Sequence, residues 1–381
     1  MSIFLIVSWA LVALVAGSLV FSTLMMLAAR RYASVRVPPP PREWPPVSIL
    51  TPLAGKDLGL YENLRSSFEQ DYPAFEVVFA VRRDDDPAVE IARRLIQEFP
   101  RVPARLVVAG EPDCPNAKVH NLKALTAAAR YDLLVMNDSD IYSAPGTLRT
   151  IAAEFAADPR LALATCVSTA VGGAGWAARL EALLMNTQFM GGVLTARMLE
   201  GVKFALGPSS VVRRAALESI GGWDALDEYL AEDFMLGNRI SESGAGVILS
   251  QARVEHRIGN AGWSATMAHR LRWCRSTRRS RPKGYVGEVF TNPIPIALAL
   301  VAVQPATWPL FVFTLLLRYL SCWAVADWAL RDRMALRDFW AIPIQDLIAF
   351  AVWVAGFFGN TVAWRGIRYE LSADGRFRVA Q

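Results

Sequence analysis

Two carboxylates, Asp138 and Asp140, lie one residue apart directly after an apolar run that ends at Met136. Such a run predicts a buried strand, and in an open α/β sheet ligands bind at the carboxyl ends of the strands. Two adjacent acids repel each other unless a positive charge lies between them, and a hard divalent cation with its phosphates meets that need. Taken alone, the pair is more often a solvated turn that caps the next helix.

Two further acidic positions and one lysine are candidates for the same chemistry. Asp86 follows an expected strand at residues 77–81, and Glu232 with Asp233 opens a helical pattern. Each is alone more often a turn or a helix cap. Lys118 begins another helix, where its charge and the free N–H groups would suit a phosphate, a solvated lysine being the alternative.

A basic segment lies just before the C-terminal apolar region. Seven cations fall within 14 residues: Arg270, Arg272, Arg275, Arg278, Arg279, Arg281 and Lys283. They could meet anionic lipid head groups or neutralise a leaving diphosphate. Nucleic acid is not expected as a partner, because the segment adjoins membrane segments and has no base-reading module.

Together these residues indicate one chemistry. A metal-bound nucleotide diphosphate leaves, a hydroxyl attacks, and a carboxylate takes the proton of that hydroxyl. An arginine or lysine near the site would offset the charge that grows on the diphosphate.

The elements that must position these residues alternate between strand and helix patterns after a proline-rich spacer. Such alternation predicts an α/β fold with a mostly parallel sheet and helices on both of its faces. Expected strands cover residues 47–52, 75–82, 105–108 and 132–136, and expected helices cover 58–70, 87–99 and 117–129.

Apolar segments at both ends of the chain predict membrane attachment. Apolar residues make up 53% of the chain, and the mean hydropathy is +0.27. Residues 3–27 carry no charge and can span a bilayer, and Arg30 and Arg31 behind them place the following chain in the cytoplasm. Residues 307–330 and 341–364 are also long enough to span, whereas 293–303 is short and resembles a re-entrant or interfacial piece. Arginines flank the last apolar segment on both sides, so charge assigns no side to the C-terminus.

The four cysteines are far apart and show no paired spacing. We therefore expect reduced thiols in a cytoplasmic domain, with no zinc site and no disulfide framework.

The order of the motifs resembles the family 2 type of inverting glycosyltransferases with the GT-A fold. Its marks D, D-x-D, E-D and (Q/R)-x-x-R-W read here as Asp86, Asp138-Ser139-Asp140, Glu232-Asp233 and His269-Arg-Leu-Arg272-Trp273. The resemblance is closest to ceramide glucosyltransferases and the related bacterial hopanoid-biosynthesis-associated glycosyltransferases. It rests on Pro52-Leu-Ala-Gly-Lys56, Asp71-Tyr-Pro73, Tyr131-Asp-Leu133, Ala231-Glu-Asp233 and the membrane layout, and it covers about residues 3–370.

The resemblance implies roles on the donor side of the site. Asp86 would contact the uridine portion of the nucleotide, with Lys118 nearby. Asp138 and Asp140 would hold the donor and its Mg²⁺ or Mn²⁺, with Asp140 as the direct metal ligand.

It also implies roles in proton transfer and at the acceptor. Asp233 would be the general base, with Glu232 as a supporting carboxylate, while Arg272 and Trp273 would bind the diphosphate and line the acceptor mouth. His269 departs from the motif, which has Gln or Arg there, and this weakens any link to processive polysaccharide synthases.

The resemblance implies a membrane layout around a GT-A (Rossmann-like) cytoplasmic domain with N- and C-terminal transmembrane helices. The expected parts are an N-terminal anchor (1–30), a proline-rich linker (31–46), the GT-A domain (47–262), a basic interfacial segment (263–291), a C-terminal membrane module (292–364) and a basic tail (365–381). The protein would be a multi-pass protein of the bacterial inner membrane.

The implied function is transfer of one sugar, glucose or N-acetylglucosamine, from a UDP-sugar to a hydroxyl of a membrane lipid of the hopanoid or ceramide type. The alternatives are a processive polysaccharide synthase and a catalytically inactive membrane protein that binds a nucleotide or lipid. Two or three C-terminal segments are few for the channel that a synthase needs, and every acidic position is intact.

Overall fold

The computed structural model describes residues 3–332, 335–364 and 366–380. The chain forms two compact units. The sheet unit comprises Arg36–Val171, Glu200–Gly259 and Gly375–Gln381, and the helical unit comprises Met1–Val35, Gly172–Leu199 and Asn260–Asp374.

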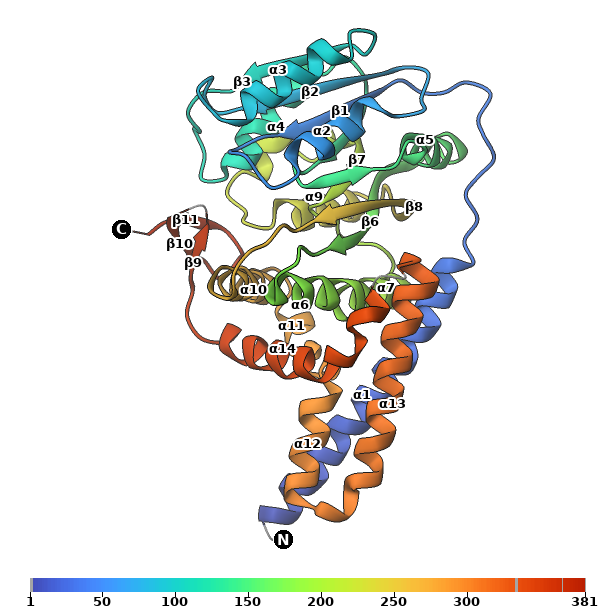
Figure 1. Ribbon diagram of the computed structural model, residues 1–381, viewed down its shortest axis with the longest axis vertical. Helices are drawn as coiled ribbons and strands as arrows, with labels where there is room; N and C mark the ends of the chain where they lie inside the picture. The colour runs from blue at the N-terminus through green and yellow to red at the C-terminus, as the bar shows by residue number, and fades with distance from the viewer. Residues whose placement is uncertain (1–2, 333–334, 365, 381) are drawn as a thin grey trace. The chain divides into compact units, whose positions relative to one another are not determined.

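The sheet unit is built on an α/β sheet with the strand order β3-β2-β1-β4-β7-β6-β8-β5 (Figure 1). The strands are β1 (Val47–Pro52), β2 (Phe75–Val81), β3 (Ala104–Val108), β4 (Leu133–Asn137), β5 (Ile141–Ser143), β6 (Leu161–Val171), β7 (Ser209–Arg213) and β8 (Gly246–Arg257). The first four in this order pair in parallel, as the alternating pattern predicts. The rest is mixed, because β7 runs antiparallel to β4 and β6, while β6 and β8 are parallel.

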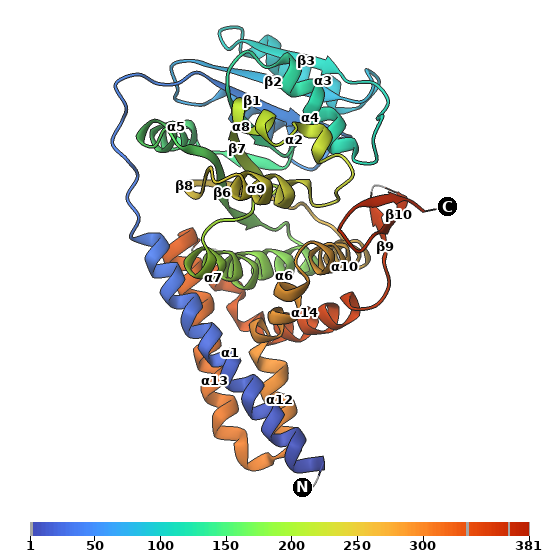
Figure 2. The ribbon, with the colours of Figure 1, turned by 180° about the vertical axis from the view of Figure 1, so that it is seen from behind.

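Helices cover both faces of this sheet, so its central strands are buried on both sides and are rich in apolar residues. On one face α2 (Leu60–Phe68), α3 (Ala88–Glu98) and α5 (Thr147–Ala157) pack in one core. On the other face α4 (Ala117–Ala128), α8 (Arg214–Ser219) and α9 (Glu232–Glu242) pack in a second core (Figure 2). A short 3₁₀ helix, η2 (Trp223–Ala225), and β11 (Phe377–Val379) complete this unit.

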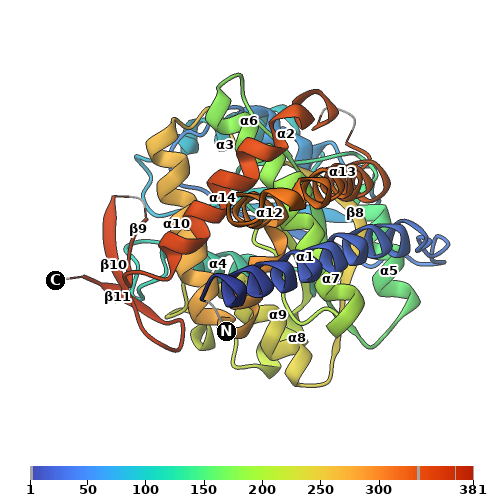
Figure 3. The same ribbon diagram turned by 90° about the horizontal axis from the view of Figure 1, so that it is seen from below.

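In the helical unit α1 (Ile3–Ala33), α12 (Pro293–Val303) and α13 (Trp308–Ala324) lie side by side (Figures 1 and 2). The 3₁₀ turn η4 (Pro305–Thr307) joins α12 to α13 as a hairpin. α14 (Ile342–Gly356) runs across the direction of these helices (Figures 1 and 3). It packs against α10 (Trp263–Ser280) and α6 (Trp176–Leu184).

Among the described residues, the segments Ile3–Ala33, Pro305–Leu330 and Leu336–Gly356 are long and apolar enough to cross a membrane. The bent pair Pro282–Thr291 and Pro293–Val303, with an angle of 63° between its helices, could form one more span. The remaining elements of this unit are η1 (Met185–Phe189), α7 (Met190–Glu200), α11 (Pro282–Gly287), η3 (Glu288–Thr291), η5 (Val325–Leu330), η6 (Ala335–Ala341), β9 (Thr361–Trp364) and β10 (Ile367–Leu371).

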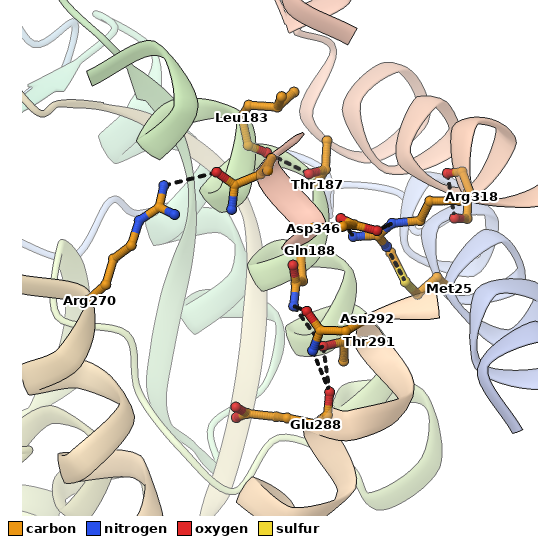
Figure 4. Close-up of polar contacts among 12 residues, drawn as sticks. Met25, Leu183, Thr187, Gln188, Arg270, Glu288, Thr291, Asn292, Arg318 and Asp346 are labelled. Carbon is orange, nitrogen blue, oxygen red and sulfur yellow. Dashed lines mark hydrogen bonds and ion pairs between the residues drawn. The ribbon is translucent and has the colours of Figure 1, made fainter. Parts of the chain in front are cut away.

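Buried polar contacts hold the helices of this unit to one another (Figure 4). Arg318 of α13 forms a two-pronged ion pair with Asp346 of α14, at 2.9 Å from Nε and 2.7 Å from Nη2, and both side chains are 1% exposed. Gln188 of η1 donates to Thr291 Oγ1 at 2.7 Å. Arg270 of α10 bonds to Glu181 of α6 and, at 3.1 Å, to Gln345 Oε1 of α14. The four cysteines are free, as their spacing predicts.

Candidate active site

The acidic pair lies where the sequence predicts it, at the carboxyl end of a buried strand. β4 ends at Asn137, whose side chain accepts a hydrogen bond from Ser209 Oγ of β7 at 2.8 Å. The next N–H, that of Asp138, donates to Pro208 O at 3.0 Å. These contacts tie the pair to the neighbouring strand, so its carboxylates are held at the edge of the sheet.

Lys118 lies between two of the predicted carboxylates and is not a solvated lysine. The Asn116 side chain caps α4 by accepting from Lys118 N and Val119 N, at 3.0 and 3.3 Å. Lys118 Nζ is 2.8 Å from Asp138 Oδ1 and 3.1 Å from Glu232 Oε1. Burial lowers the pKa of Lys118, but Asp138, Glu232 and Asp233 outweigh it and raise that pKa above its usual value.

Asp233 lies across a glycine from Asp138. A Cβ atom placed on Gly207 would be 3.0 Å from Asp233 Oδ2 and 3.9 Å from Asp138 Oδ2. Gly207 therefore lies close to both carboxylates, and a side chain there would require Asp233 to shift by a few tenths of an ångström.

The pKa of Asp233 is raised to about 7, first by burial and then by the nearby charge of Glu232, while Lys118 opposes the rise. Asp233 lines a small cavity of about 20 Å³, and apolar side chains in its walls bury the carboxylate. Beside Lys118, Asp138, Glu232 and Asp233, its walls include the apolar side chains of Leu122, Met136, Leu206, Trp223 and Leu236. A carboxylate with a pKa near 7 is matched to general base catalysis at neutral pH.

Asp140 has the character of a cation ligand. Its Oδ1 is buried without a hydrogen-bond partner, while Oδ2 lies 3.1 Å from His256 Nε2 of β8. Burial acts to raise the pKa of Asp140, but the contact with His256 lowers it below the usual value, so the carboxylate is ionised. In the described part of the chain no group of three or more His, Cys, Asp or Glu residues could hold a metal ion. The donors suit an ion that keeps waters and phosphate oxygens as its other ligands, as Mg²⁺ does.

The sequence alone did not identify His256 as part of this site. It lies 116 residues from Asp140, and no motif joins the two. The only local signal is its place near the end of β8, after the apolar residues that begin the strand.

Asp86 has a structural role in the loop that it occupies. Its carboxylate accepts from Gly55 N at 3.0 and 3.1 Å and from Ala88 N, at the start of α3, at 2.9 Å. The loop of Gly55 also reaches the acidic pair, because Ser139 Oγ donates to Asp57 at 2.9 Å. Asp86 therefore fixes the loop between β1 and α2, which contacts the Asp-Ser-Asp motif.

Arg272 and Trp273 belong to the helical unit, on α10. The Arg272 guanidinium lies 5.7 Å from the centre of the Trp364 ring. Trp273 packs between His269 and Phe189, with ring centres 4.7 and 5.6 Å away.

Other arginines of the basic segment make structural contacts within the helical unit. Arg270 pairs with Glu181, and Arg275 and Arg278 donate to backbone carbonyls in the stretch 357–361 that follows α14. Fewer cations of this segment are therefore available to a ligand than the seven in the sequence.

The model of glycosyl transferase family 21 matches residues 8–377 of the chain. The chain belongs to this family. Ceramide glucosyltransferase 1 of Caenorhabditis elegans is 26% identical over 345 residues, which is 88% of this chain and 74% of that protein. The ceramide glucosyltransferase of Komagataella phaffii is 34% identical over 123 residues, 31% of this chain and 24% of that protein.

Among solved structures, a mannosyltransferase from Pyrobaculum calidifontis in complex with GDP-Man and Mn²⁺ aligns with a TM-score of 0.56. It is 19% identical, and the alignment covers 92% of this chain and 99% of that one. This likeness supports the GT-A fold expected from the order of the motifs. The family membership makes this chain a glycosyltransferase.

Proposed function

We propose that this family 21 glycosyltransferase transfers one sugar, glucose or N-acetylglucosamine, from a UDP-sugar to the hydroxyl of a membrane lipid, with inversion at the anomeric carbon. The observation that carries the proposal is the placement of Asp233, with a pKa of about 7, across Gly207 from Asp138. One carboxylate is thus poised to accept a proton, while another faces the cationic Lys118.

In this mechanism the lipid hydroxyl attacks the anomeric carbon from the side opposite the diphosphate. The new C–O bond forms as the bond from the sugar to the diphosphate breaks, and its electron pair leaves with UDP. Asp233 takes the hydroxyl proton, and Glu232, held by Lys118 and Asn116, helps burial to raise the pKa of this base toward neutral pH.

The donor side is assigned to the residues around Asp138. Asp140 and Asp138 would hold Mg²⁺ or Mn²⁺, which supplies positive charge to the diphosphate when bound. The buried Asp140 Oδ1, which lacks a hydrogen-bond partner, supports this assignment. Asp86 would contact the uridine, with Lys118 nearby, while Arg272 and Trp273 would bind the diphosphate and line the acceptor mouth.

The acceptor proposed is a lipid of the ceramide or hopanoid type. The ceramide glucosyltransferases among the relatives and the long apolar helices of the helical unit support a lipid. We assign the protein to the bacterial inner membrane, with the catalytic unit in the cytoplasm.

The test is the variant Asp233→Asn, assayed for transfer and for UDP binding. We expect transfer to be abolished and UDP affinity to change little, because the amide keeps the shape of the side chain but cannot accept the proton. Wild-type turnover in this variant would contradict the role of Asp233 as the base. The matched variant Glu232→Gln should retain part of the activity.

A mass spectrum of the product completes the test. A lipid carrying one sugar agrees with the proposal, and a long sugar chain would show a polysaccharide synthase instead. Binding of UDP-sugar with neither transfer nor metal-dependent hydrolysis in the wild type would show a protein without catalysis.

A further inference from the structure

The composition of α14 is that of a membrane span, but its packing is not. By length and hydropathy, Leu336–Gly356 could be a membrane span. In the structure, however, α12 lies along α1 and α13, and α14 crosses this bundle and packs along α10 (Figures 1 and 3).

The partner of α14 limits the depth at which it can lie in a bilayer. α10 carries five arginines in eighteen residues. A charged side chain at the centre of a bilayer costs about 3 kcal/mol or more, so α10 cannot lie in the hydrocarbon core and must remain at its surface.

Contacts at both ends of α14 keep it beside α10. Near its start, Gln345 accepts from Arg270 Nη2 at 3.1 Å. Just past its end, Phe358 O accepts from Arg275 Nε at 3.0 Å, and Gly359 O accepts from Arg278 Nη2 at 2.6 Å. Because both ends are fixed to the arginine-rich helix, α14 stays beside α10 along its length, at a helix-packing distance of about 8–10 Å.

The exposed face of α14 is apolar along one stripe. The exposed positions recur at intervals of three and four residues, which keeps them on one side of the helix. They are Ile344, Leu347, Ala351, Val354 and Ala355, with Phe358 just past the end of the helix, all exposed and none of them polar. The polar side chains of α14 point inward, since Gln345 is 2% exposed and Asp346 is 1% exposed.

We propose that α14 does not cross the membrane but lies flat in the surface of the bilayer, with this stripe (the α14 stripe) against the acyl chains. The partner of this surface is the lipid bilayer itself. The neighbouring α13 also exposes apolar side chains, among them Phe313, Leu316 and Leu320.

A topology follows from this arrangement. α10 precedes the α12–α13 hairpin and α14 follows it, yet the two pack together. The hairpin therefore enters and leaves the bilayer at the same surface. The turn Pro305–Thr307 lies toward the other side, and the residues after α14 stay on the side of α10. Were α14 a span, those residues would be on the side of the turn.

Single cysteines at two exposed positions separate these outcomes. Ala306→Cys lies in the turn, and Ser372→Cys lies after β10. The full-length protein is labelled with a membrane-impermeant maleimide in sealed right-side-out and inverted vesicles. The labelling of the unsubstituted chain, which carries the four native cysteines, is subtracted as background. A permeant maleimide confirms that each cysteine reacts. We expect the two cysteines to be labelled from opposite sides, and labelling from the same side would overturn the proposal.

Depth measurements along the α14 stripe test the flat orientation independently. Spin labels are attached through Ile344→Cys, Ala351→Cys and Phe358→Cys in proteoliposomes, and their accessibility to oxygen and to a polar nickel chelate is compared. A flat helix gives similar shallow depths at the three positions. A crossing helix gives a maximum at Ala351 with shallow values at both ends, which would refute the proposal.

Discussion

Replacing Asp233 by asparagine should stabilise the sheet unit at neutral and higher pH while it removes transfer activity. Burial and Glu232 raise the pKa of Asp233 from 3.8 to about 7. The unfolded chain ionises near the lower value, so the folded state loses stability as the pH rises from about 4 to about 7. Asparagine keeps the size and remains neutral, so it escapes this loss.

The size of the effect follows from the pKa shift. A shift of about three units corresponds to ~4 kcal/mol at 1.36 kcal/mol per unit. Asp233 is only partly buried, and water screens such a group, so we expect about half of this, ~2 kcal/mol. For a unit of this size, that raises the unfolding temperature by about 6 °C.

The assay is calorimetric unfolding of the purified full-length wild type and the Asp233→Asn variant, at pH 4.5 and at pH 8. We expect nearly equal unfolding temperatures at the lower pH and a more stable variant at the higher pH. An offset that is the same at both values, or a less stable variant at pH 8, would refute the reasoning. Asp71→Asn is the control: Arg149 lowers the pKa of Asp71, so its carboxylate is ionised across this range and its offset should stay flat.

Three further predictions concern the same site. Gly207→Ala puts a Cβ atom 3.0 Å from Asp233 Oδ2 and should lower kcat about tenfold or more by displacing the base. Gly146→Ala is the control: its added Cβ atom would meet no atom within 4 Å, so it should keep full activity. Equal kcat values in the two variants would contradict the role of Gly207 beside the base. Lys118→Met leaves Asp138 and Glu232 without their cation, so calorimetry should show a loss of about 3 kcal/mol and titration a weaker affinity for UDP; unchanged values would argue against a central role. Removal of divalent ions with EDTA should abolish transfer, and Mn²⁺ should restore it. The Asp140→Ala variant should need at least about tenfold more Mn²⁺ than the wild type for half-maximal transfer. An unchanged Mn²⁺ requirement would show that Asp140 is not the metal ligand.

The sequence was sufficient to predict the parallel half of the sheet. β1, β2 and β4 are rich in apolar residues, as is usual for strands buried on both faces, and the helical patterns between them require crossovers. The mixed half was not predictable in the same way. β5 is three residues long, and its partner β8 follows about a hundred residues later, so no local pattern records their pairing.

Much of the candidate site was named from the sequence, but its geometry was not. Asp138, Asp140 and Asp233 could be selected because each lies at the end or start of an element. The place of Lys118 between Asp138 and Glu232 depends on contacts between β4, α4 and α9, which are distant in the chain. Gly207 has no side chain whose chemistry would indicate a role in the site. The run of arginines does not indicate that Arg275 and Arg278 bind the backbone carbonyls after α14.

The Arg318–Asp346 pair has a consequence for how the protein is made. The two residues are 28 positions apart, and α13 leaves the ribosome before α14. Arg318 therefore enters the membrane before Asp346 lies beside it, and its unpaired charge is unfavourable there, by up to about 3 kcal/mol at the centre of a helix. Until then, the apolar residues around Arg318 in α13 and the contacts of α13 with α1 must stabilise the inserted helix. A chain truncated before α14 and released from the ribosome should leave α13 poorly inserted, and a chain that includes Asp346 should insert it stably.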